Sequence, residues 1–482
     1  MKHKNNGFVY IAGAGPWDAG LLTLKCADAL TRADAVVYDA LVNPTVLTIA
    51  KNAELIFAGK RAGNHAMEQD EINRLLLRLA SESKTVVRLK GGDPYIFGRG
   101  AEEALYLKEH GIKYEIINGV SSAYAVPASA GISVTDRNTA SSVHIITAHP
   151  GGAGKKPGYK TLARLEGTLV FMMGKSRLGE ISSELIKYGK PENTPCAVVS
   201  EGTSPRMRCA AGTLSDIEKK AAELPSPAVA VVGVAAENAC GKNGGELFGK
   251  RIICAGLENT LAGLENEIPG AQLLRIPIIK TIKKERVKAP DITGFDCIAF
   301  SSANGAEYFF EYLNEQNIDL RRLCGIRLAV LGERARLSLQ KRGLIPDILA
   351  KTHNAEGLAE AIAEDGKCKS VLIPCSSRGG RELSDRLKNI RAERLELFDT
   401  ITDMSRAELF SLYEPTADCV VLTSGTCAGA YREILPHGGA ASIAAIGAST
   451  KRRAGELGIR VASSAETPDV RAVADAIRRA VL

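Results

Sequence analysis

A glycine-rich turn is the first feature of the chain that could do chemistry. The sequence Gly13-Ala14-Gly15-Pro16-Trp17-Asp18-Ala19-Gly20 follows a short apolar run and precedes a helical pattern. Such turns often bind a dinucleotide, and Asp39 lies where a ribose-binding acid would be expected. However, Pro16 has no backbone N–H to offer a phosphate, and Asp18 adds a carboxylate beside it. The turn therefore disfavours NAD and suits a cationic or neutral ligand.

A second polar turn, Gly91-Gly92-Asp93, follows the apolar run 85–89. Glycines allow a ligand to approach the backbone closely, and a carboxylate can accept hydrogen bonds from a ligand's hydroxyl or amino groups. A tight turn with a solvated aspartate would look the same in sequence. Both interpretations stay open on these residues alone.

Metal and disulfide chemistry have little support in the sequence. The eleven cysteines include no C-x-x-C pair, and the seven histidines show no paired spacing, so we expect no metal and reduced, buried thiols. The net charge of +7 is spread without a dense basic block. This distribution predicts no nucleic-acid partner, while a modest positive excess suits a small polyanion. No apolar run approaches the roughly 18 residues that cross a bilayer, and no signal peptide is evident, which predicts a cytoplasmic protein without a membrane partner.

Short β-branched runs alternate with helical patterns along the chain, which predicts an α/β fold with parallel sheets. The Gly/Asn-rich stretch 238–250 is the clearest linker. We therefore expect one domain at 1–240, with subdomains at about 1–136 and 137–240, a linker at 241–249 and a second domain at 250–482. The strands are expected at 8–13, 35–38, 54–58, 85–89, 114–117, 143–147, 168–172, 195–200, 228–234, 251–254, 297–301, 328–331, 370–374, 419–423 and 442–446.

The second domain repeats itself. Residues 298–313 are similar to 420–435, and residues 328–343 are similar to 443–458. In each pair an expected strand ends in a turn of small residues that opens a helix. Two copies, and not a longer series, indicate two similar α/β lobes.

Over roughly residues 7–240 the chain resembles the uroporphyrinogen-III C-methyltransferases. The resemblance rests on ordered blocks, chiefly GAGPWDAGLLTLKCADAL (13–30), GKRAG (59–63), VRLKGGDPYIFGRGAEE (87–103), NGVSSAYAVPASAGISVT (118–135) and VVSEGTSPRMR (198–208). It implies a tetrapyrrole-methylase fold of two α/β subdomains and a homodimer formed through this half.

The same resemblance implies transfer of two methyl groups from S-adenosyl-L-methionine to uroporphyrinogen III, giving precorrin-2. Asp39 matches the family's proton acceptor and Lys60 its proposed proton donor. Trp17 departs from the family, which usually has Gly there, and Ala19 stands where Pro is common. The implied cofactor-binding residues are Pro16, Gly91, Gly92, Asp93, Ile96, Ser121, Ser122, Met173 and Gly202.

Residues 249–482 resemble the uroporphyrinogen-III synthases. The matching blocks include FSSANG (300–305), LAVLGERARLSLQKRGLIPD (328–347), VLIPCSSRGGRELSDRL (371–387), VLTSGT (421–426) and AAIGASTKRRAGELG (444–458). The resemblance implies two flavodoxin-like α/β lobes, one from about 250–280 plus 401–482 and the other from about 281–400. It also implies cofactor-free cyclisation of hydroxymethylbilane to uroporphyrinogen III, with inversion of ring D and loss of water.

Small polar residues in strand-end turns are the candidates for binding the tetrapyrrole polycarboxylate in this half. Each could instead cap a helix. The candidates are Ser301, Ser302, Asn304, Thr423, Ser424, Gly447 and Thr450.

One departure and two alternatives remain. Many synthases carry a Tyr where this chain has Phe398, before Asp399 and Thr400. A catalytically silent C-terminal binding module is therefore an alternative for this half. An NAD-dependent oxidoreductase is the alternative for the first half, opposed by Pro16 and Asp18.

Overall fold

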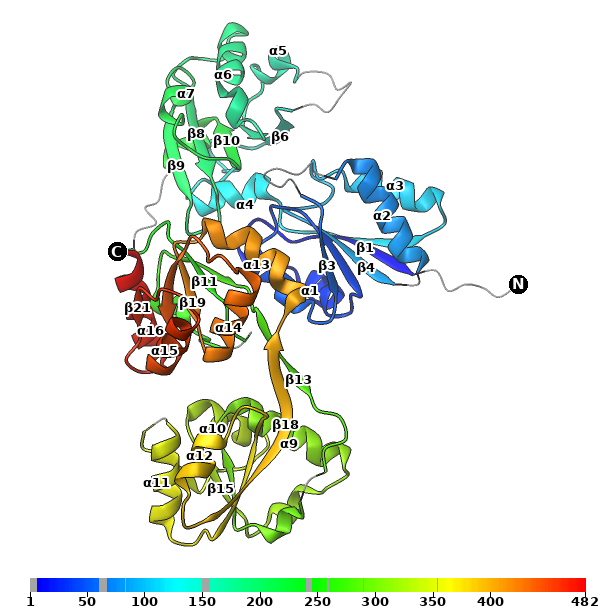
Figure 1. Cartoon of the computed structure of the whole chain (residues 1–482). Coiled ribbons are helices and arrows are strands. Elements are labelled where there is room, and N and C mark those ends of the chain that lie inside the picture. The colour runs from blue at the N-terminus through cyan, green and yellow to red at the C-terminus, as the bar shows by residue number, and fades with distance from the viewer. Residues whose placement is uncertain are drawn as a thin grey trace, which may run out of the picture. The chain divides into compact units, whose positions relative to one another are not determined.

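The computed structural model describes residues 7–59, 67–82, 84–149, 157–239, 245–257, 260–288, 290–352 and 354–482. The chain divides into two compact units, which are Met1–Ile278 together with Asp403–Leu482, and Ile279–Thr402. Figure 1 traces the chain through four β-sheets with their helices. Three of these sheets belong to the first unit and one to the second.

The first sheet is parallel throughout and has the strand order β3-β2-β4-β1-β5. Helix α2 packs an apolar stripe of Ile72, Leu76 and Leu79 against it, at the spacing of one helix face. A reciprocal capping box between Glu68 and Glu71 begins this helix. The elements are β1 (Phe8–Gly13), α1 (Leu24–Thr31), β2 (Ala35–Tyr38), β3 (Glu54–Phe57), α2 (Gln69–Ser81), β4 (Thr85–Lys90), α3 (Gly100–Glu109) and β5 (Lys113–Ile117).

The strand order creates a switch point between β4 and β1. Strand β1 connects to β2 on one side of the pair, whereas β4 connects to β5 on the other. The two turns that leave these neighbouring strands diverge and open a crevice at the carboxyl edge of the sheet. These turns carry Gly15 and Pro16 after β1, and Gly91, Gly92 and Asp93 after β4.

The second sheet is mixed, with the order β6-β7-β10-β8-β9. Strands β6 and β7 are parallel, and the other neighbours are antiparallel. Helix α4 packs Ala123 and Val126 against the apolar side chains Val170, Val199 and Val231 of this sheet. The elements are α4 (Ser122–Ser129), β6 (Val143–Thr147), α5 (Tyr159–Leu162), β7 (Thr168–Met172), α6 (Leu178–Lys187), β8 (Pro195–Ser200), β9 (Arg208–Thr213), α7 (Ile217–Lys220) and β10 (Ala228–Val232).

The third sheet is parallel, with the order β12-β11-β19-β20-β21. In chain order this is 2-1-3-4-5, the arrangement of flavodoxin. Helix α16 closes one face through Val473, Ala476 and Ile477. The elements are β11 (Arg251–Cys254), α8 (Leu264–Glu267), β12 (Gln272–Arg275), α13 (Ala407–Tyr413), β19 (Cys419–Leu422), α14 (Gly425–Ile434), β20 (Ser442–Ala445), α15 (Ala448–Glu456), β21 (Ser463–Ser464) and α16 (Val470–Val481).

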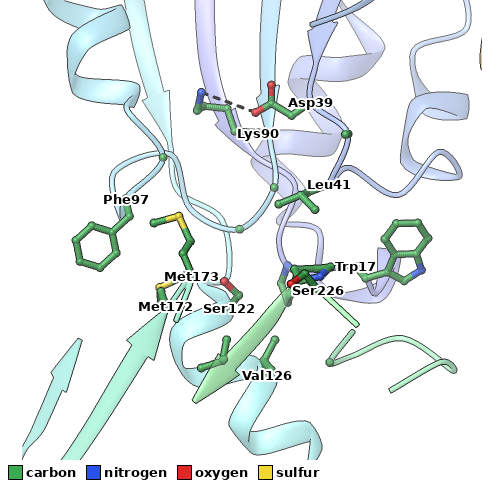
Figure 2. Close-up of a pocket in the computed structure, with 18 of the residues that line it drawn as sticks. Trp17, Asp39, Leu41, Lys90, Phe97, Ser122, Val126, Met172, Met173 and Ser226 are labelled. Atoms are coloured by element: carbon green, nitrogen blue, oxygen red, sulfur yellow. Dashed lines mark ion pairs between the residues drawn. The ribbon is translucent and has the colours of Figure 1, made fainter. Parts of the chain in front are cut away.

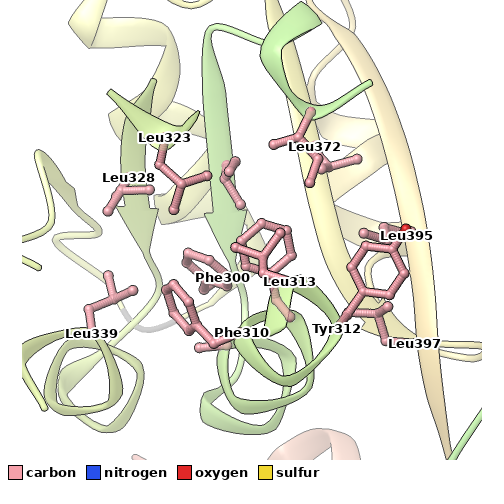
Figure 3. Packing of buried hydrophobic residues seen from close by; sticks show 14 of the residues in the cluster. Phe300, Phe310, Tyr312, Leu313, Leu323, Leu328, Leu339, Leu372, Leu395 and Leu397 are labelled. Carbon is pink, nitrogen blue, oxygen red and sulfur yellow. The ribbon is translucent and has the colours of Figure 1, made fainter. Parts of the chain in front are cut away.

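The second unit holds a six-stranded sheet of order β13-β18-β17-β14-β15-β16, in which only the edge pair β13 and β18 is antiparallel. Figure 3 shows Phe300 and Phe310 packed with Leu313 and Leu328 in its core. The elements are β13 (Ile279–Lys283), β14 (Cys297–Phe300), α9 (Ala303–Glu315), β15 (Arg327–Val330), α10 (Glu333–Gln340), β16 (Ile348–Leu349), α11 (Ala355–Asp365), β17 (Ser370–Ser376), α12 (Arg381–Arg386) and β18 (Arg391–Thr402).

The repeated sequence segments form equivalent structure in the two lobes. One copy builds β14-α9-β15-α10 and the other builds β19-α14-β20-α15, and in each the two strands are parallel neighbours. The lobes differ in strand order, because the parallel strands of the second unit run 3-2-1-4-5 in chain order. The expected α/β class is confirmed, with the repeated units inserted into two different parallel sheets.

The expected strands are confirmed to within two residues at each end, but five further strands were not expected, β9, β12, β13, β16 and β21. The long strand β18 was also missed, because its charged sequence RAERLELFDTIT hides the alternation of an edge region. Among the described cysteines nine are free thiols, and Cys324 is exposed. Cys209 is disulfide-bonded, so the expectation of uniformly reduced and buried thiols was wrong at these two positions.

None of the helices in the described ranges combines the length and apolar composition needed to cross a membrane. Within those same ranges, no group of three or more His, Cys, Asp or Glu side chains is arranged to hold a metal ion.

Candidate functional site

A cavity of about 890 Å³ lies at the switch point of the first sheet, within the size range of small-molecule sites. Most of its lining comes from the turns after β1 and β4, the end of β2, the start of α4, the end of β7 and the turn between β8 and β9. Every cofactor-binding residue expected from the sequence lines it, and so does Asp39. These residues are Pro16, Gly91, Gly92, Asp93, Ile96, Ser121, Ser122, Met173 and Gly202. Lys60 lies outside the described residues.

Figure 2 shows side chains that line the cavity. Asp39 and Lys90 lie next to each other at one end, and Met173 lies near Phe97. Trp17 stands on the opposite side from Phe97 in this view. The cavity thus combines a charged end with sulfur and aromatic surfaces.

The turn after β1 is a poor cradle for a pyrophosphate, because Pro16 has no N–H and three of the other amides donate to protein oxygens. The Gly15 N–H donates to the Gly92 carbonyl at 3.2 Å, and the Gly20 N–H donates to the Asp18 carboxylate at 2.8 Å. The Asp18 N–H donates to the Thr203 hydroxyl at 3.3 Å. A dinucleotide loop needs such N–H groups free at a helix N-terminus. This geometry opposes the NAD alternative.

The turn after β4 is held from within by Asp93, which is 7% exposed. One carboxylate oxygen accepts from the Tyr95 N–H at 2.8 Å, and the other accepts from the Asn118 amide and the Gly119 N–H, both at 3.1 Å. The aspartate therefore ties the β4 turn to the segment that leads into α4. Its two oxygens fix the wall of the cavity, which is a structural role that the sequence alone could not separate from ligand binding.

Glycine is required where the turns after β1, β4 and β5 approach one another. A Cβ on Gly13 would lie 2.4 Å from the Gly92 carbonyl oxygen, and a Cβ on Gly119 would lie 2.2 Å from the same atom. Real contacts are never that short, so these positions admit no side chain. The close crossing brings the turns after β1, β4 and β5 together at one edge of the sheet.

Asp39 ends β2 and belongs to a buried ionic network. The Arg88 guanidinium donates to Asp39 at 2.6 Å and to Glu103 at 3.1 Å, and the Lys90 ammonium donates to Glu103 at 2.9 Å. Lys90 also lies 3.9 Å from Asp39. Arg88, Lys90 and Glu103 are almost completely buried, whereas the Asp39 side chain keeps 29% of its surface exposed. Two acids and two bases thus neutralise one another, with Asp39 as the member that faces the cavity.

The network changes the proton affinity of Lys90. Burial lowers the pKa of its ammonium, and the adjacent Arg88 guanidinium lowers the pKa further, against the attraction of Glu103 and Asp39. One oxygen of Glu103 is buried and has no hydrogen-bond partner within the described structure. Sequence reasoning missed this network. Its available signal was the pair of cations at 88 and 90, two residues apart on one face of an otherwise apolar strand.

Backbone strain is concentrated around the cavity. Phe97, Arg99, Met173 and Glu201 all have φ between 47° and 58° although none is glycine, and all four line the cavity. Residues held in this region cost energy and are common at ligand sites. Met173 in addition keeps 46% of its surface exposed. An exposed, strained methionine does not serve core packing, so its position favours a contact with a ligand.

The synthase candidates lie in strand-end turns. Ser302 caps α9 by accepting from the Gly305 N–H at 3.0 Å, and Ser424 caps α14 by accepting from the Cys427 N–H at 3.1 Å. These serines are equivalent positions of the repeat. Thr423 and Ser424 follow β19 and Gly447 follows its neighbour β20, so they share one sheet edge, while Ser301, Ser302 and Asn304 belong to the other unit. Thr450 is only 2% exposed.

Phe398 is buried in the core of the second unit, with 4% of its surface exposed. Its ring stacks on Tyr308 with centroids 4.6 Å apart and an interplanar angle of 15°. The Tyr308 hydroxyl donates to the Thr281 hydroxyl at 2.8 Å. A phenol is therefore present beside Phe398, on helix α9 and not on β18.

The cavity is large enough for a cofactor. It lies at the carboxyl edge of a parallel sheet and is closed by a second, mixed sheet. These features define an α/β enzyme of two subdomains that binds a small molecule between them. Two further doubly wound lobes follow it in the same chain.

Comparison with known proteins identifies the family to which the chain belongs. Residues 9–218 match the family model of the tetrapyrrole (corrin/porphyrin) methylases, and residues 262–475 match that of uroporphyrinogen-III synthase HemD. The porphyrin biosynthesis protein HemD of Ruminiclostridium josui is 36% identical over 83% of this chain and 82% of its own length. The chain belongs to this family, in which a tetrapyrrole methylase is joined to a uroporphyrinogen-III synthase.

Other relatives match the first half. The S-adenosyl-L-methionine-dependent uroporphyrinogen III methyltransferase of Methanosarcina barkeri is 46% identical over 48% of this chain and 92% of its own length. A crystal structure of uroporphyrin-III C-methyltransferase from Thermus thermophilus, complexed with S-adenyl homocysteine, shares 37% identity. It covers 48% of this chain and 99% of that chain, with a TM-score of 0.43.

Proposed function

We propose that residues 1–240 transfer two methyl groups from S-adenosyl-L-methionine to uroporphyrinogen III, giving precorrin-2. We further propose that residues 250–482 make uroporphyrinogen III from hydroxymethylbilane with inversion of ring D. The observation that carries the first proposal is the convergence of nine expected cofactor residues and Asp39 on one cavity. The relative from Methanosarcina barkeri, named as an S-adenosyl-L-methionine-dependent methyltransferase, supports the same assignment.

The residues of the cavity fit S-adenosyl-L-methionine better than a phosphate-bearing cofactor. The amides of Gly15, Asp18 and Gly20 already donate to protein oxygens, and Asp39 presents a carboxylate to the cavity. Gly91 and Gly92 expose backbone, and Met173 offers a polarisable sulfur. When bound, the cofactor would supply an electrophilic methyl group. Pro16, Ile96, Ser121, Ser122 and Gly202 would complete its enclosure.

Asp39 is the proposed proton acceptor of the methylation. As the new carbon–carbon bond forms at the pyrrole carbon, the methyl–sulfur bond breaks, and the ring afterwards loses a proton. A carboxylate held at the cavity surface can take that proton. Arg88 donates to the Asp39 carboxylate at 2.6 Å and fixes the orientation of that side chain. Lys60 is the proposed proton donor. A homodimer through this half completes the proposal.

The synthase chemistry needs positioning more than activation, because hydroxymethylbilane closes readily by itself. Helix N-termini and small polar side chains bind carboxylates through N–H and hydroxyl donors. We assign this role to Ser301, Ser302, Asn304, Thr423, Ser424 and Gly447, and to Thr450 only through the backbone, since its side chain is buried. No cofactor takes part in this step. Tyr308 supplies the phenol that Phe398 lacks.

Two binding and turnover measurements test the halves separately. Calorimetric titration of the full chain with S-adenosyl-L-methionine and with NADH should show binding of the first alone, and the reverse result rejects the methyltransferase assignment. The silent-module alternative has Phe398 in its favour. It is tested by chromatography of the porphyrin isomers formed from hydroxymethylbilane, since a silent module leaves isomer I as the main product.

A further inference from the structure

Residues of the third sheet line the methyltransferase cavity. Arg251 begins β11, Gln272 begins β12, and Tyr413 ends α13, and all three belong to the cavity wall together with Asp39 and Trp17. The synthase family match, residues 262–475, covers the other four strands of this sheet, and β11 with Arg251 lies just before the match and pairs with β12 and β19. The methyl-transfer site is therefore bounded in part by the other enzyme of the chain.

The third sheet is anchored to the segment that follows Asp39. The buried Arg406 guanidinium donates to the carbonyls of Leu47 and Ala50, both at 3.1 Å. The Tyr413 hydroxyl donates to the Val42 carbonyl at 3.4 Å. Arg406 is only 4% exposed, and a buried guanidinium requires such acceptors.

A second anchor lies one step further along the same segment. The Arg275 N–H donates to the Thr45 hydroxyl at 3.2 Å. The 3-10 helix Val46–Ile49 that these bonds hold is buried over Val46, Leu47 and Thr48. This segment is continuous with the strand end that presents Asp39, so the contact fixes the relation of Arg251 to the proposed base.

The presence of an indole at position 17 is explained by its contact with Arg251. The Arg251 guanidinium carbon lies 6.0 Å from the centroid of the Trp17 ring and 6.0 Å from that of Tyr413. The Asn43 amide donates to the Trp17 carbonyl at 2.8 Å and holds the loop in place. Aromatic rings at this distance stabilise a cation. The residue that departs from the family's usual Gly thus contacts a side chain of the third sheet.

Arg251 carries a charge that no carboxylate of the described residues neutralises by direct contact. It is 8% exposed, and its guanidinium donates to the Gln272 amide oxygen and the Thr416 hydroxyl. Burial lowers its pKa, Arg206 lowers it further, and Tyr413, Glu201 and Asp418 oppose them. A buried cation without an ionic partner is costly, and an anionic ligand in the cavity would relieve that cost.

We infer that Arg251 binds a carboxylate of the tetrapyrrole in the methyl-transfer site, held for that task by Trp17 and Tyr413. The inference rests on the proposed function, because it takes the polycarboxylate uroporphyrinogen III as substrate. Guanidinium groups bind carboxylates through two parallel hydrogen bonds. Arg251 is thus a substrate-positioning residue that the third sheet contributes to the methyltransferase.

Steady-state methylation by the full chain tests this inference with Arg251→Met. Loss of a charged hydrogen bond should raise KM for uroporphyrinogen III by about tenfold. KM for S-adenosyl-L-methionine should stay within about twofold, since the cofactor has its own contacts. Arg251→Lys should recover part of the loss. The matched control is Arg432→Met, whose guanidinium also donates to two protein oxygens but lies outside the cavity. It should leave both constants unchanged.

Trp17→Gly gives a second variant on the methyltransferase side, which leaves the third sheet intact. It should raise KM for uroporphyrinogen III by about threefold, and its effect should not add fully to that of Arg251→Met. An unchanged KM in a folded Arg251→Met or in Trp17→Gly overturns the inference, as does an equal rise in KM for the cofactor. Failure of the unmodified chain to methylate uroporphyrinogen III overturns instead the proposed function.

Discussion

The Arg88 guanidinium donates to Asp39 at 2.6 Å from the inner side of the first sheet. Arg88 is 1% exposed, whereas the Asp39 side chain keeps 29% of its surface open. The buried member therefore orients the member that faces the cavity. This pair holds the Asp39 carboxylate in a fixed position at the charged end of the cavity (Figure 2).

Replacing Asp39 by Asn should lower kcat for methylation by roughly 10²-fold or more, because general-base assistance contributes about that factor. Binding of S-adenosyl-L-methionine, measured by calorimetry, should change by less than about twofold. Asp34→Asn is the control, since Asp34 lies at the opposite end of β2 and accepts from the Thr85 N–H. A kcat for Asp39→Asn close to that of this control would exclude the assigned role.

Glu103→Gln should destabilise the first unit by about 3 kcal/mol, because it leaves Arg88 and Lys90 buried with one carboxylate fewer. Glu103 is 0% exposed and contacts both cations. Its neighbour Glu102 pairs with Arg99 at the surface, so Glu102→Gln should cost less than about 1 kcal/mol. Urea unfolding at pH 7 measures both variants. Equal losses of unfolding free energy in the two variants would show that the buried network stabilises the protein no more than a surface ion pair does.

Tyr413→Phe gives a pH-dependent result. Burial raises the pKa of Tyr413 to about 12, with Arg251 opposing. Between pH 10 and pH 12 the unfolded chain releases this proton while the folded chain keeps it, so the free energy of unfolding falls as pH rises. Tyr413→Phe has no phenol at this position, so its free energy of unfolding does not fall with pH for this reason. At pH 7 it should be less stable by up to about 1 kcal/mol, from the lost hydrogen bond to Val42.

By pH 11 the stability difference between Tyr413→Phe and the unmodified chain should shrink or reverse, by about 1 kcal/mol relative to pH 9. Urea unfolding at both pH values checks the shift. A difference that stays constant over this range would mean that the phenol is not buried against the first sheet.

Tyr308→Phe tests the phenol beside Phe398. Removal of the hydroxyl that donates to Thr281 should lower synthase kcat by about tenfold and increase the share of isomer I, as expected for loss of a positioned proton donor. Tyr312→Phe is the matched control, because Tyr312 lies one turn further along α9 and packs in the same core. Synthase activity and isomer ratio are read by chromatography. Equal kcat values and isomer ratios for Tyr308→Phe and Tyr312→Phe would show that the Tyr308 hydroxyl has no role in the synthase reaction.

The sequence predicted the strands that β-branched residues build, since burial on both faces leaves a continuous apolar signal. The nine cofactor-binding residues that the family resemblance implied all line one cavity. Strand order could not be predicted from the sequence, and neither could strand β18, which lies between the edge strand β13 and β17 and whose charged residues alternate weakly. Arg88 and Glu103 were missed because charges in a buried strand and on a helix reveal their pairing only when packed.

Trp17 shows the same limit most clearly. Its departure from the usual Gly was visible in the sequence, but its contact with Arg251 joins positions more than 200 residues apart through the packing of two sheets. Local propensity carries no information about such a contact.

The most direct test supplies the full chain with hydroxymethylbilane, with and without S-adenosyl-L-methionine, and identifies the isomers and methylation states of the products. The account predicts uroporphyrinogen III without the cofactor and the dimethylated precorrin-2 with it. Isomer I as the main product without the cofactor would contradict the synthase assignment, and unmethylated isomer III in its presence would contradict the methyltransferase assignment.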